Sequence, residues 1–567
     1  MKRFKFLIGF CLGALILLAP FSQFKALPLE PLQTLAVQLD GRQKPLDTVA
    51  KETTAKIHGA AHYSQTDGET LDYLQTYLSI WFNDRNWNET PFVLFSYRPL
   101  KSQLGLDPEQ KYFAFEPLIS NAQLASIVQQ AHQQTLNGEA LTRDQREALT
   151  IEDRLNLMSR TVGDTSLPLA PHPSDPQGAW MSLATAQTRY APEHLTPLIA
   201  RFEMLKQAYL SNTNPASADQ LARIGQLADE LHQDLVNLSP QVYPADGDLK
   251  REVHFNRFHP FAKACRLYAI AFIAMLLAIW LKPMELYWSA IGVFVAGILV
   301  QGYGFWLRMQ IAGRPPVTNM YESVVWVGFG IVALALAFEL TYRAQYYLLA
   351  AAPLSVLCLI LADSLPAVLD PGIDPLVPVL RDNFWLSIHV PTIALSYASF
   401  ALALGLGHVT LGNYLFTPQA KQRIQTLSQL NYRVLQVGVL LLTTGIILGG
   451  IWAYFSWGRF WGWDPKETWT LIALLCYLAP LYSRLVGWIG NFGVSIASVV
   501  SFNAVLMAWY GVNFVLGTGL HSYGFSTGGS ALFVGGIVGL DLLFVLAAVI
   551  KHQGRFSGQS ESFGETV

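Results

Sequence analysis

Residues 433–469 read RVLQVGVLLLTTGIILGGIWAYFSWGRFWGWDPKETW and contain the two features that decide the fold. The first part, 433–453, carries a single charged side chain, that of Arg433. An α-helix needs about 20 predominantly apolar residues to cross the hydrocarbon core of a bilayer, so this stretch predicts a membrane span. The remainder, from Trp452 onward, contains polar and charged residues and many aromatic side chains, and it predicts a loop outside the membrane.

Similar apolar runs recur through the second half of the chain. The whole chain of 567 residues is 52% hydrophobic and only 14% charged, with a mean hydropathy of +0.30, whereas a soluble globular protein carries roughly a quarter charged residues. The predicted fold is an α-helical polytopic membrane protein with nine transmembrane helices, or ten if an N-terminal span is retained. The candidate spans are 264–281, 286–307, 321–340, 346–363, 384–411, 433–453, 469–486, 493–516 and 531–550.

The N-terminus resembles a targeting segment. Residues 1–24 begin with Lys2, Arg3 and Lys5, and an apolar stretch from Phe6 to Pro20 follows. This pattern is typical of a cleaved signal peptide or of a retained membrane anchor, and its short apolar region fits either. Both alternatives place the following segment outside the cytoplasm.

Residues 25–260 are polar and predict a mainly helical extracytoplasmic domain. Apolar residues recur at helical spacing in 121–134, 147–160 and 219–238, which predicts amphipathic helices. The segment from Gly41 to Thr48 is interpreted as a surface turn. The size of the region is that of one domain or two small ones.

The orientation follows from the rule that cytoplasmic loops carry an excess of Lys and Arg. With the 25–260 domain outside, the basic connections near 282, 343, 417–433 and 484 face the cytoplasm, as does the tail 551–567 with Lys551 and Arg555. The membrane domain is then 264–550. The outer segments also contain basic residues, so the rule supports this orientation without proving it. These outer segments are 308–320, 364–383, 454–468 and 517–530.

Charge and cysteine content argue against several classes of function. The formal net charge of −2 gives no reason to expect a nucleic-acid partner. No two of the four cysteines form a C-x-x-C pair, and all lie in or beside apolar runs. This pattern disfavours thiol–disulfide chemistry and a cysteine zinc site. Because C-x-x-C-H is absent, the chain is not itself a c-type cytochrome. The cysteines are Cys11, Cys265, Cys358 and Cys476.

The segment from Trp452 to Trp469 is denser in aromatic residues than a loop requires. Eight of its eighteen residues are Trp, Tyr or Phe. An interfacial belt also gathers Trp and Tyr, but a belt places one or two at each helix end. Here glycines separate the aromatics, which favours the close approach of a flat object to the backbone.

A porphyrin is such an object, because it is a large apolar disc with two carboxylates and an iron atom. Its site needs aromatic faces, cations and axial ligands. Arg459 and Lys466 are candidate partners of the carboxylates, although both are also explained as solvated loop charges. Asp464, Pro465 and Glu467 fit the N-cap, N1 and N3 positions of the next helix, so we assign them to architecture first.

Histidine is the usual neutral ligand for iron, and two histidines lie where the topology makes them useful. His389 is at the outer end of the span 384–411, and His521 is in the outer loop after 493–516. They bracket the aromatic segment on the same side of the membrane. The spacing leaves two alternatives open, namely bis-histidine ligation and ordinary hydrogen bonding at a membrane interface.

These residues carry a resemblance to a known family. The run from Leu442 through Trp457-Gly-x-x-Trp-x-Trp-Asp-Pro-Lys-Glu467 closely resembles the CcsA (ResC) branch of the haem-handling superfamily, with its tryptophan-rich "WWD" segment. The regions around His389 and His521 are similar to the family's two histidine regions. Residues 313–323, GRPPVTNMYES, also resemble a family motif, although Asn319 and Glu322 fit a helix start. The resemblance covers about 285–525.

The resemblance implies a role for each matching residue. It implies that His389 and His521 are the axial ligands of haem on the extracytoplasmic side, and that Trp457, Trp461 and Trp463 line the haem site. No catalytic residue is assigned. Proteins of this family work with a ResB (CcsB)-like partner as a haem exporter and cytochrome c synthase, or holocytochrome c haem lyase. They join haem b, by its vinyl groups, to the thiols of C-x-x-C-H in apocytochrome c.

One departure concerns the inner haem site of the family. That site uses a histidine in the span after the tryptophan segment, whereas this chain has Tyr482 there, in Leu-Tyr-Ser-Arg. Tyrosine is able to ligate haem iron but is usually an interfacial aromatic. His408 lies within the span 384–411, about 28 Å from His389 at 1.5 Å per residue, and is the alternative inner ligand. Hydrogen bonding is the default role for both residues.

Three functions remain after this comparison. The leading one is a haem-presenting subunit of a cytochrome c synthase in the bacterial cytoplasmic membrane, in contact with lipid, a ResB-like protein and apocytochrome c. The second is a haem exporter or chaperone without synthase activity. The third is a membrane scaffold that binds no haem and docks a partner through its tryptophan loop. The bracketing histidines disfavour the third function but do not separate the first two.

Overall fold

The computed structural model describes residues 30–60, 62–64, 70–139, 141–163, 166–211, 218–281, 284–364, 369–376, 378–516, 521 and 531–564. The predicted targeting segment 1–24 lies outside these residues. The described chain divides into two compact units. The N-terminal unit runs to Phe258 and includes Gly372–Pro375; the membrane unit holds the rest, from His259 onward.

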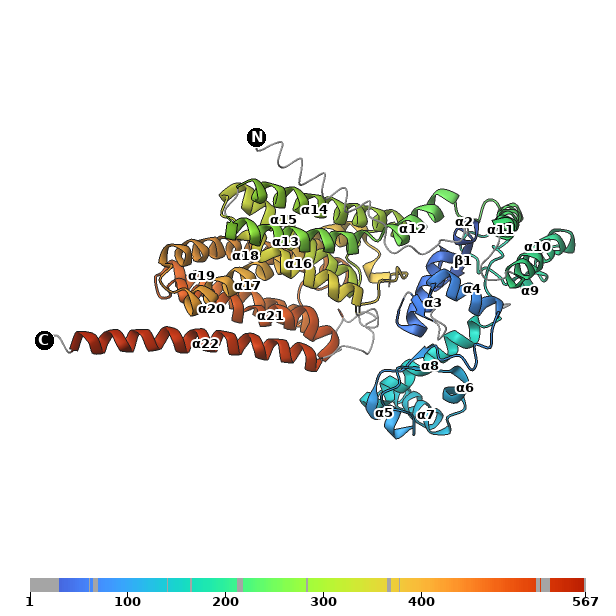
Figure 1. The fold of residues 1–567 in the computed structure, drawn as a ribbon, viewed down its shortest axis with the longest axis horizontal. Helices are drawn as coiled ribbons and strands as arrows, with labels where there is room; N and C mark the ends of the chain where they lie inside the picture. The colour runs from blue at the N-terminus through green and yellow to red at the C-terminus, as the bar shows by residue number, and fades with distance from the viewer. Residues whose placement is uncertain are drawn as a thin grey trace. The chain divides into compact units, whose positions relative to one another are not determined.

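The membrane unit consists of long helices that run alongside one another (Figure 1). Their order is α13 (Pro260–Leu281), α14 (Met284–Ala312), α15 (Met320–Tyr342), α16 (Tyr347–Ser364), η1 (Pro378–Leu380), α17 (Asn383–Phe416), α18 (Lys421–Trp457), α19 (Pro465–Leu485), α20 (Asn491–Val500), α21 (Phe502–Leu506), the π-helix η2 (Met507–Leu516) and α22 (Ala531–Gly564). Within the unit, α17 packs against α15, α16, α18, α20 and α22.

The predicted membrane spans are confirmed. In the part of the chain that the structure describes, nine helical stretches are long and apolar enough to cross a bilayer, and each contains or overlaps one predicted span. The chain is therefore a helical polytopic membrane protein. The stretches are Asp246–Leu281, Met284–Ala312, Met320–Tyr342, Tyr347–Ser364, Asn383–Phe416, Lys421–Trp457, Pro465–Leu485, Asn491–Leu516 and Leu532–Gln553.

Polar side chains at the helix ends determine where these spans begin. The first turn of a helix leaves backbone N–H groups without partners inside the helix. Asn319 supplies a side-chain oxygen to the amide of Glu322 at the start of α15, at 2.8 Å. Asp382 does the same for Phe384 and Trp385 at the start of α17. These caps fix the first turns of two helices that border the cavity described below.

The N-terminal unit is mainly helical, as predicted, with three small two-stranded antiparallel sheets. Its elements are α2 (Glu30–Gln33), β1 (Ala36–Leu39), β2 (Arg42–Pro45), α3 (Leu46–His58), β3 (His62–Ser64), β4 (Thr70–Asp72), α4 (Tyr73–Phe82), β5 (Val93–Leu94), α5 (Arg98–Gln103), β6 (Tyr112–Phe113), α6 (Phe115–Ile119), α7 (Ala122–Leu136), α8 (Arg143–Thr161), α9 (Leu183–Ala186), α10 (Pro192–Leu210), α11 (Ala218–Leu238) and α12 (Asp246–Phe258). The predicted amphipathic segments 121–134, 147–160 and 219–238 form parts of α7, α8 and α11.

The interpretation of Gly41 to Thr48 as a surface turn is wrong. Only the tip of the β1–β2 hairpin turns, with Gly41 at φ +77°. Lys44 and Thr48 are buried, and Asp47 is fully buried at the start of α3. The polar residues in this stretch are explained by specific partners, since the buried Lys44 forms ion pairs with the more exposed Asp40 and Glu52.

Candidate functional site

The loop between α18 and α19 is organised by the helix start that follows it. Asp464 accepts a hydrogen bond from the backbone amide of Lys466 at 3.1 Å. The carboxylate of Glu467 in turn accepts from the amides of Asp464 (3.3 Å) and Gly462 (2.7 Å). This capping box confirms the predicted role of Asp464 and Glu467 in architecture.

The glycines of the loop have local roles. Gly458 ends α18 in the left-handed region, at φ +70°, and its amide bonds to the carbonyl of Tyr454. The guanidinium of Arg459 lies against Gly462, where a Cβ would collide with it. The space beside this glycine is thus taken by a side chain of the loop itself, so we no longer expect it to face a ligand.

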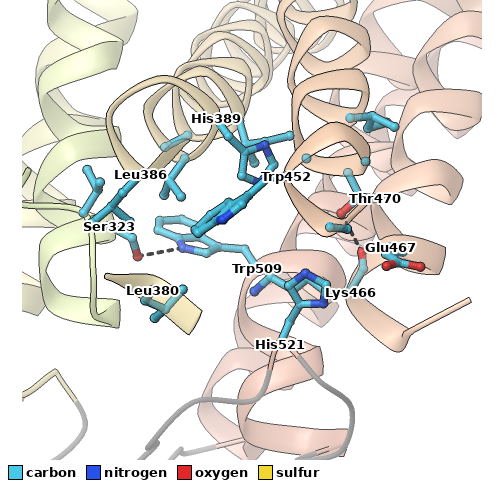
Figure 2. A pocket seen from close by; sticks show the side chains of 18 of the residues that line it. Ser323, Leu380, Leu386, His389, Trp452, Lys466, Glu467, Thr470, Trp509 and His521 are labelled. Atoms are coloured by element: carbon cyan, nitrogen blue, oxygen red, sulfur yellow. Dashed lines mark hydrogen bonds between the residues drawn. The ribbon is translucent and has the colours of Figure 1, made fainter. Parts of the chain in front are cut away.

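A mostly apolar cavity with a volume of about 240 Å³ lies where six elements of the membrane unit meet. These are the start of α15, η1, the first turns of α17, the end of α18, the start of α19, and η2. The structure brings His389, His521, Trp457, Trp461 and Lys466 together in the lining, all of which were predicted as site residues. Figure 2 shows both histidines directed into this cavity.

His389 lies on α17 and is held by α18. Its Nδ1 is 2.9 Å from the carbonyl oxygen of Gly445. A carbonyl only accepts hydrogen bonds, so Nδ1 carries the proton and the lone pair of the neutral ring is on Nε2. A Cβ at Gly449 would lie 2.5 Å from Cε1 of His389, so the ring packs against α18 only because residue 449 is glycine.

His521 is held by the start of α19. Its Nδ1 is 2.9 Å from Oδ2 of Asp464, and its ring stands edge-on to Trp457 with 5.0 Å between ring centroids. A metal-ligating histidine usually donates its other ring N–H to a carboxylate or a backbone carbonyl, which fixes the tautomer and the ring orientation. Asp464 and Gly445 provide these two kinds of acceptor for His521 and His389.

The predicted tryptophans do not all lie in the same environment. Trp457 and Trp461 line the cavity, and the Nε1 of Trp461 is buried without a hydrogen-bond partner among the described residues. Trp463 has φ +58° and is 69% exposed, with its ring edge-on to Trp461. The structure does not place Trp463 in the lining, so its contact with a ligand stays a prediction.

Of the two predicted cationic residues, only one lines the cavity. Arg459 lies outside the lining, 3.5 Å from the Glu467 carboxylate and over the ring of Trp457. Lys466 lines the cavity, and its ammonium is 3.4 Å from the side-chain oxygen of Asn513. Lys466 forms no ion pair with any carboxylate that the structure describes, so it is the better candidate partner for an anionic group in the cavity.

The candidate inner ligands, His408 and Tyr482, lie outside the cavity. Nδ1 of His408 is 2.9 Å from the carbonyl oxygen of Leu404, and its Nε2 contacts the carboxylate of Asp541 on α22. Tyr482 is 60% exposed and stands edge-on to Trp488. Both nitrogens of His408 are already engaged, so ligation by this residue would require Asp541 to move away.

Several lining residues were missed by sequence reasoning. Trp452 lies 5.8 Å from His389, ring centroid to ring centroid, and was available in the aromatic segment. Trp509 and Asn513 line the cavity from η2, and Ser323 from α15. The only available signal for η2 was the aromatic residues just before His521. The bond from His521 to Asp464 joins residues 57 positions apart, and no spacing pattern indicates it.

The motif at 313–323 leads into α15 and includes its N-cap and first turn. Asn319 is the N-cap, as predicted. Glu322 pairs with Arg308 of α14 at 2.7 Å, with both side chains almost fully buried, and also accepts from the amide of Thr318. This ion pair holds the residues from Val317 to Ser323 that border the cavity.

Comparison with known proteins places these residues in a family. Residues 317–521 match the family described as Cytochrome C assembly protein. This region contains the whole cavity lining. The chain is 33% identical to cytochrome c biogenesis protein CcsA of a Synechococcus strain over 298 residues, which cover 96% of that protein and 46% of this chain.

The chain belongs to the CcsA family of cytochrome c biogenesis proteins. Other relatives agree with this assignment. The chain is 35% identical to CcsA of Prochlorococcus marinus over 254 residues, which cover 80% of that protein. It is also 30% identical to protein NrfI of Wolinella succinogenes over 498 residues, or 85% of this chain. The chain spans about half the length of NrfI, since the match covers 53% of that protein.

The relatives match different shares of the chain. The CcsA relatives match 39% to 47% of it, less than the length of the membrane unit. NrfI matches 85% of the chain, so its similarity extends well into the N-terminal unit. The cavity lies in the part that the family shares.

Proposed function

We propose that this member of the CcsA family holds haem b in the cavity, with His389 and His521 as axial ligands, and presents it for covalent attachment to apocytochromes c. The observation that carries the proposal is the placement of these two histidines. Both line one cavity, and the Nδ1 atom of each is held by an acceptor. Neutral imidazoles held in this way suit iron ligation through Nε2.

The residues around the histidines fit the macrocycle and the carboxylates of haem. Aromatic side chains of Trp452, Trp457 and Trp509 line the cavity, and aromatic faces favour contact with a flat macrocycle. Haem also carries two carboxylates, which need donors. Lys466 has no carboxylate partner among the described residues, and Trp461 has a buried N–H without an acceptor there. Both would be satisfied by carboxylate oxygen atoms.

The chemistry that follows needs no oxidant. In thioether formation each cysteine S–H adds across one vinyl group of haem b, so that one C–S bond and one C–H bond form while the C=C bond becomes single. The chain's contribution is to hold the haem by its iron and to keep it accessible to the C-x-x-C-H segment. Both histidines are partly buried in a mostly apolar cavity, a setting that would favour ferrous over ferric iron, because the ferrous site carries less charge.

We further propose where this reaction takes place and with which partner. The excess of basic residues in the inner loops supports an outward-facing cavity in the bacterial cytoplasmic membrane, with the N-terminal unit on the same side. The resemblance to the CcsA family implies a ResB-like partner, and we propose such a protein for that role.

A reporter experiment separates attachment from simple haem carriage. The chain is co-expressed with a ResB-like partner and an apocytochrome that carries C-x-x-C-H or, as a control, S-x-x-S-H. We expect covalently bound haem only on the cysteine reporter, and its loss with His389→Ala or His521→Ala. Haem on the purified chain without any covalent product would show a haem chaperone rather than a synthase subunit.

A further inference from the structure

Trp509 borders the cavity from a different element than the tryptophan segment. It lies on η2, and its indole Nε1 donates a hydrogen bond to the hydroxyl oxygen of Ser323 on α15, at 3.0 Å (Figure 2). The bond joins residues that are 186 positions apart. Trp509 therefore has a fixed orientation in the lining.

The backbone at Trp509 is a π-helix, a rare form that is frequently found at functional sites. Its wider turn changes which backbone groups are paired. The side chain of Asn513 donates to the carbonyl oxygen of Trp509 at 2.8 Å, while its own oxygen faces Lys466. Asn513 thus stabilises the wide turn and connects it to the cation of the cavity.

Ser323 is equally well held. Its hydroxyl donates to the carbonyl oxygen of Met320 at 2.8 Å, which leaves its lone pairs for Trp509. The first turn of α15 is fixed by the Asn319 cap and by the buried pair between Arg308 and Glu322. The acceptor for Trp509 is therefore part of a rigid helix start.

We propose that the hydrogen bond from Trp509 to Ser323 is a positioning device, which sets the indole of Trp509 as the wall of the cavity on the α15 side, against the haem macrocycle. This inference rests on the proposed function. It gives the 313–323 motif a direct role in ligand placement, beyond starting a helix. An indole held at one end by a hydrogen bond presents a constant face to a flat ligand, whereas a free ring samples several rotamers.

The test is a double-mutant cycle on haem binding. The full chain is purified in detergent, stripped of haem, and titrated with haem b while the absorption spectrum is recorded. Trp509→Phe keeps an aromatic ring but loses the N–H, and Ser323→Ala loses the acceptor. A hydrogen bond contributes about 1 kcal/mol, so we expect each variant to bind haem roughly fivefold more weakly. The double variant should be no weaker than either single one.

Two controls separate positioning from general damage. Ser323→Thr keeps the hydroxyl and should retain most of the affinity, and Trp488→Phe alters an exposed tryptophan and should change nothing. Independent, additive losses, or unchanged binding by both single variants, would overturn the proposal. If the wild-type chain and Trp488→Phe both fail to bind haem, the proposed function itself fails, and this inference fails with it.

Discussion

Glycine 449 shows how one missing side chain positions a ligand. The ring of His389 lies so close to α18 that a Cβ at residue 449 would stand 2.5 Å from Cε1 and 3.0 Å from Nδ1. Because the ring is also tied to Gly445, it has no room to yield without losing that bond. The glycine is thus part of the candidate iron site, although it contributes no ligand atom.

We therefore predict that Gly449→Ala displaces His389. Haem affinity should fall about tenfold or more, as it does for changes in the groups that orient metal ligands, and the bis-histidine spectrum should be perturbed. Gly412→Ala is the matched control, because a Cβ there meets no atom within 4 Å. Haem titration of both variants in detergent decides the matter, and equal affinities would contradict this account of Gly449.

Asp464 has two roles that a single substitution separates. It caps α19 and also orients His521. Asparagine is as good an N-cap as aspartate, so Asp464→Asn should leave the thermal stability within about 0.5 kcal/mol. Replacement of the carboxylate beside the histidine should nevertheless weaken haem retention roughly 10- to 100-fold.

Comparison with Asp464→Ala completes that test. The alanine variant loses the cap as well, which costs about 1 kcal/mol, so its melting temperature should fall while Asp464→Asn melts like the wild type. If only Asp464→Ala, the variant with the lower melting temperature, lost haem while Asp464→Asn retained it, Asp464 would have a structural role only.

Individual residues were predictable where residue type and position in the sequence were informative by themselves. His389, His521, Trp457, Trp461 and Lys466 stood out because residue type and membrane side already limit the choice, and all of them line the cavity. The contacts that hold the site did not stand out. His389 contacts Gly445, His521 contacts Asp464 and Trp509 contacts Ser323, each across distant segments, and a single sequence carries no record of such contacts.

At the scale of elements, the membrane helices followed from hydropathy because each span must satisfy its own backbone hydrogen bonds. The nine predicted spans were confirmed for that reason. The π-helix η2 was not predicted, because the residues of a π-turn are also compatible with an α-helix and the tertiary contacts decide between them. The segment from Gly41 to Thr48 was mistaken for a surface turn because two of its charged side chains, Lys44 and Asp47, are buried with polar partners.

Loss of the ion pair between Arg308 and Glu322, at the start of α15, should greatly lower the free energy of unfolding. Arg308 and Glu322 are both nearly inaccessible, and Arg308 also donates to the carbonyl oxygen of Pro371 at 2.8 Å. Glu322→Gln leaves a buried guanidinium without its counter-charge, and such changes cost about 3–5 kcal/mol. We expect a large drop in melting temperature in detergent, and an unchanged melting curve would contradict the role assigned to this pair.

Helix α22 is attached to α17 through a polar contact within the membrane. His408 contacts Asp541, and the rings of His408 and Phe544 stack. We predict that His408→Ala lowers stability by about 1–3 kcal/mol, because it leaves a carboxylate without its partner. The haem spectrum of the purified protein should not change. Loss of a haem signal in this variant, with normal stability, would instead support the inner-ligand role of His408.

At the scale of the whole molecule, the N-terminal unit has a polar interior of its own. The carboxylate of Glu252 on α12 accepts hydrogen bonds from both terminal nitrogens of Arg42, at 2.7 and 2.9 Å, and from the hydroxyl of Thr48. Asp47, beside it, accepts from Tyr73 and Asn256, and burial raises the pKa of this carboxyl.

This network leads to a pH prediction. A raised pKa means that the folded unit binds the Asp47 proton more tightly than the unfolded chain does. The stability that it contributes is therefore present below the usual pKa of about 4 and is lost as the pH rises through the raised value. The wild-type N-terminal unit should gain less stability between pH 4 and 7 than Asp47→Asn does, measured by thermal unfolding of the full chain. If the stability of the wild type and that of Asp47→Asn changed in parallel with pH, this prediction would be contradicted.

The central claim concerns the membrane unit, where the complete cavity lining lies. The most direct measurement is the absorption spectrum of the reduced, detergent-purified chain after haem-replete expression, beside its His389→Ala, His521→Ala and His132→Ala variants. The account predicts a bis-histidine haem spectrum in the wild type and in His132→Ala, a solvent-exposed control, and its loss or weakening in the other two. Wild-type protein without haem, or full haem signals in both cavity variants, would contradict the account.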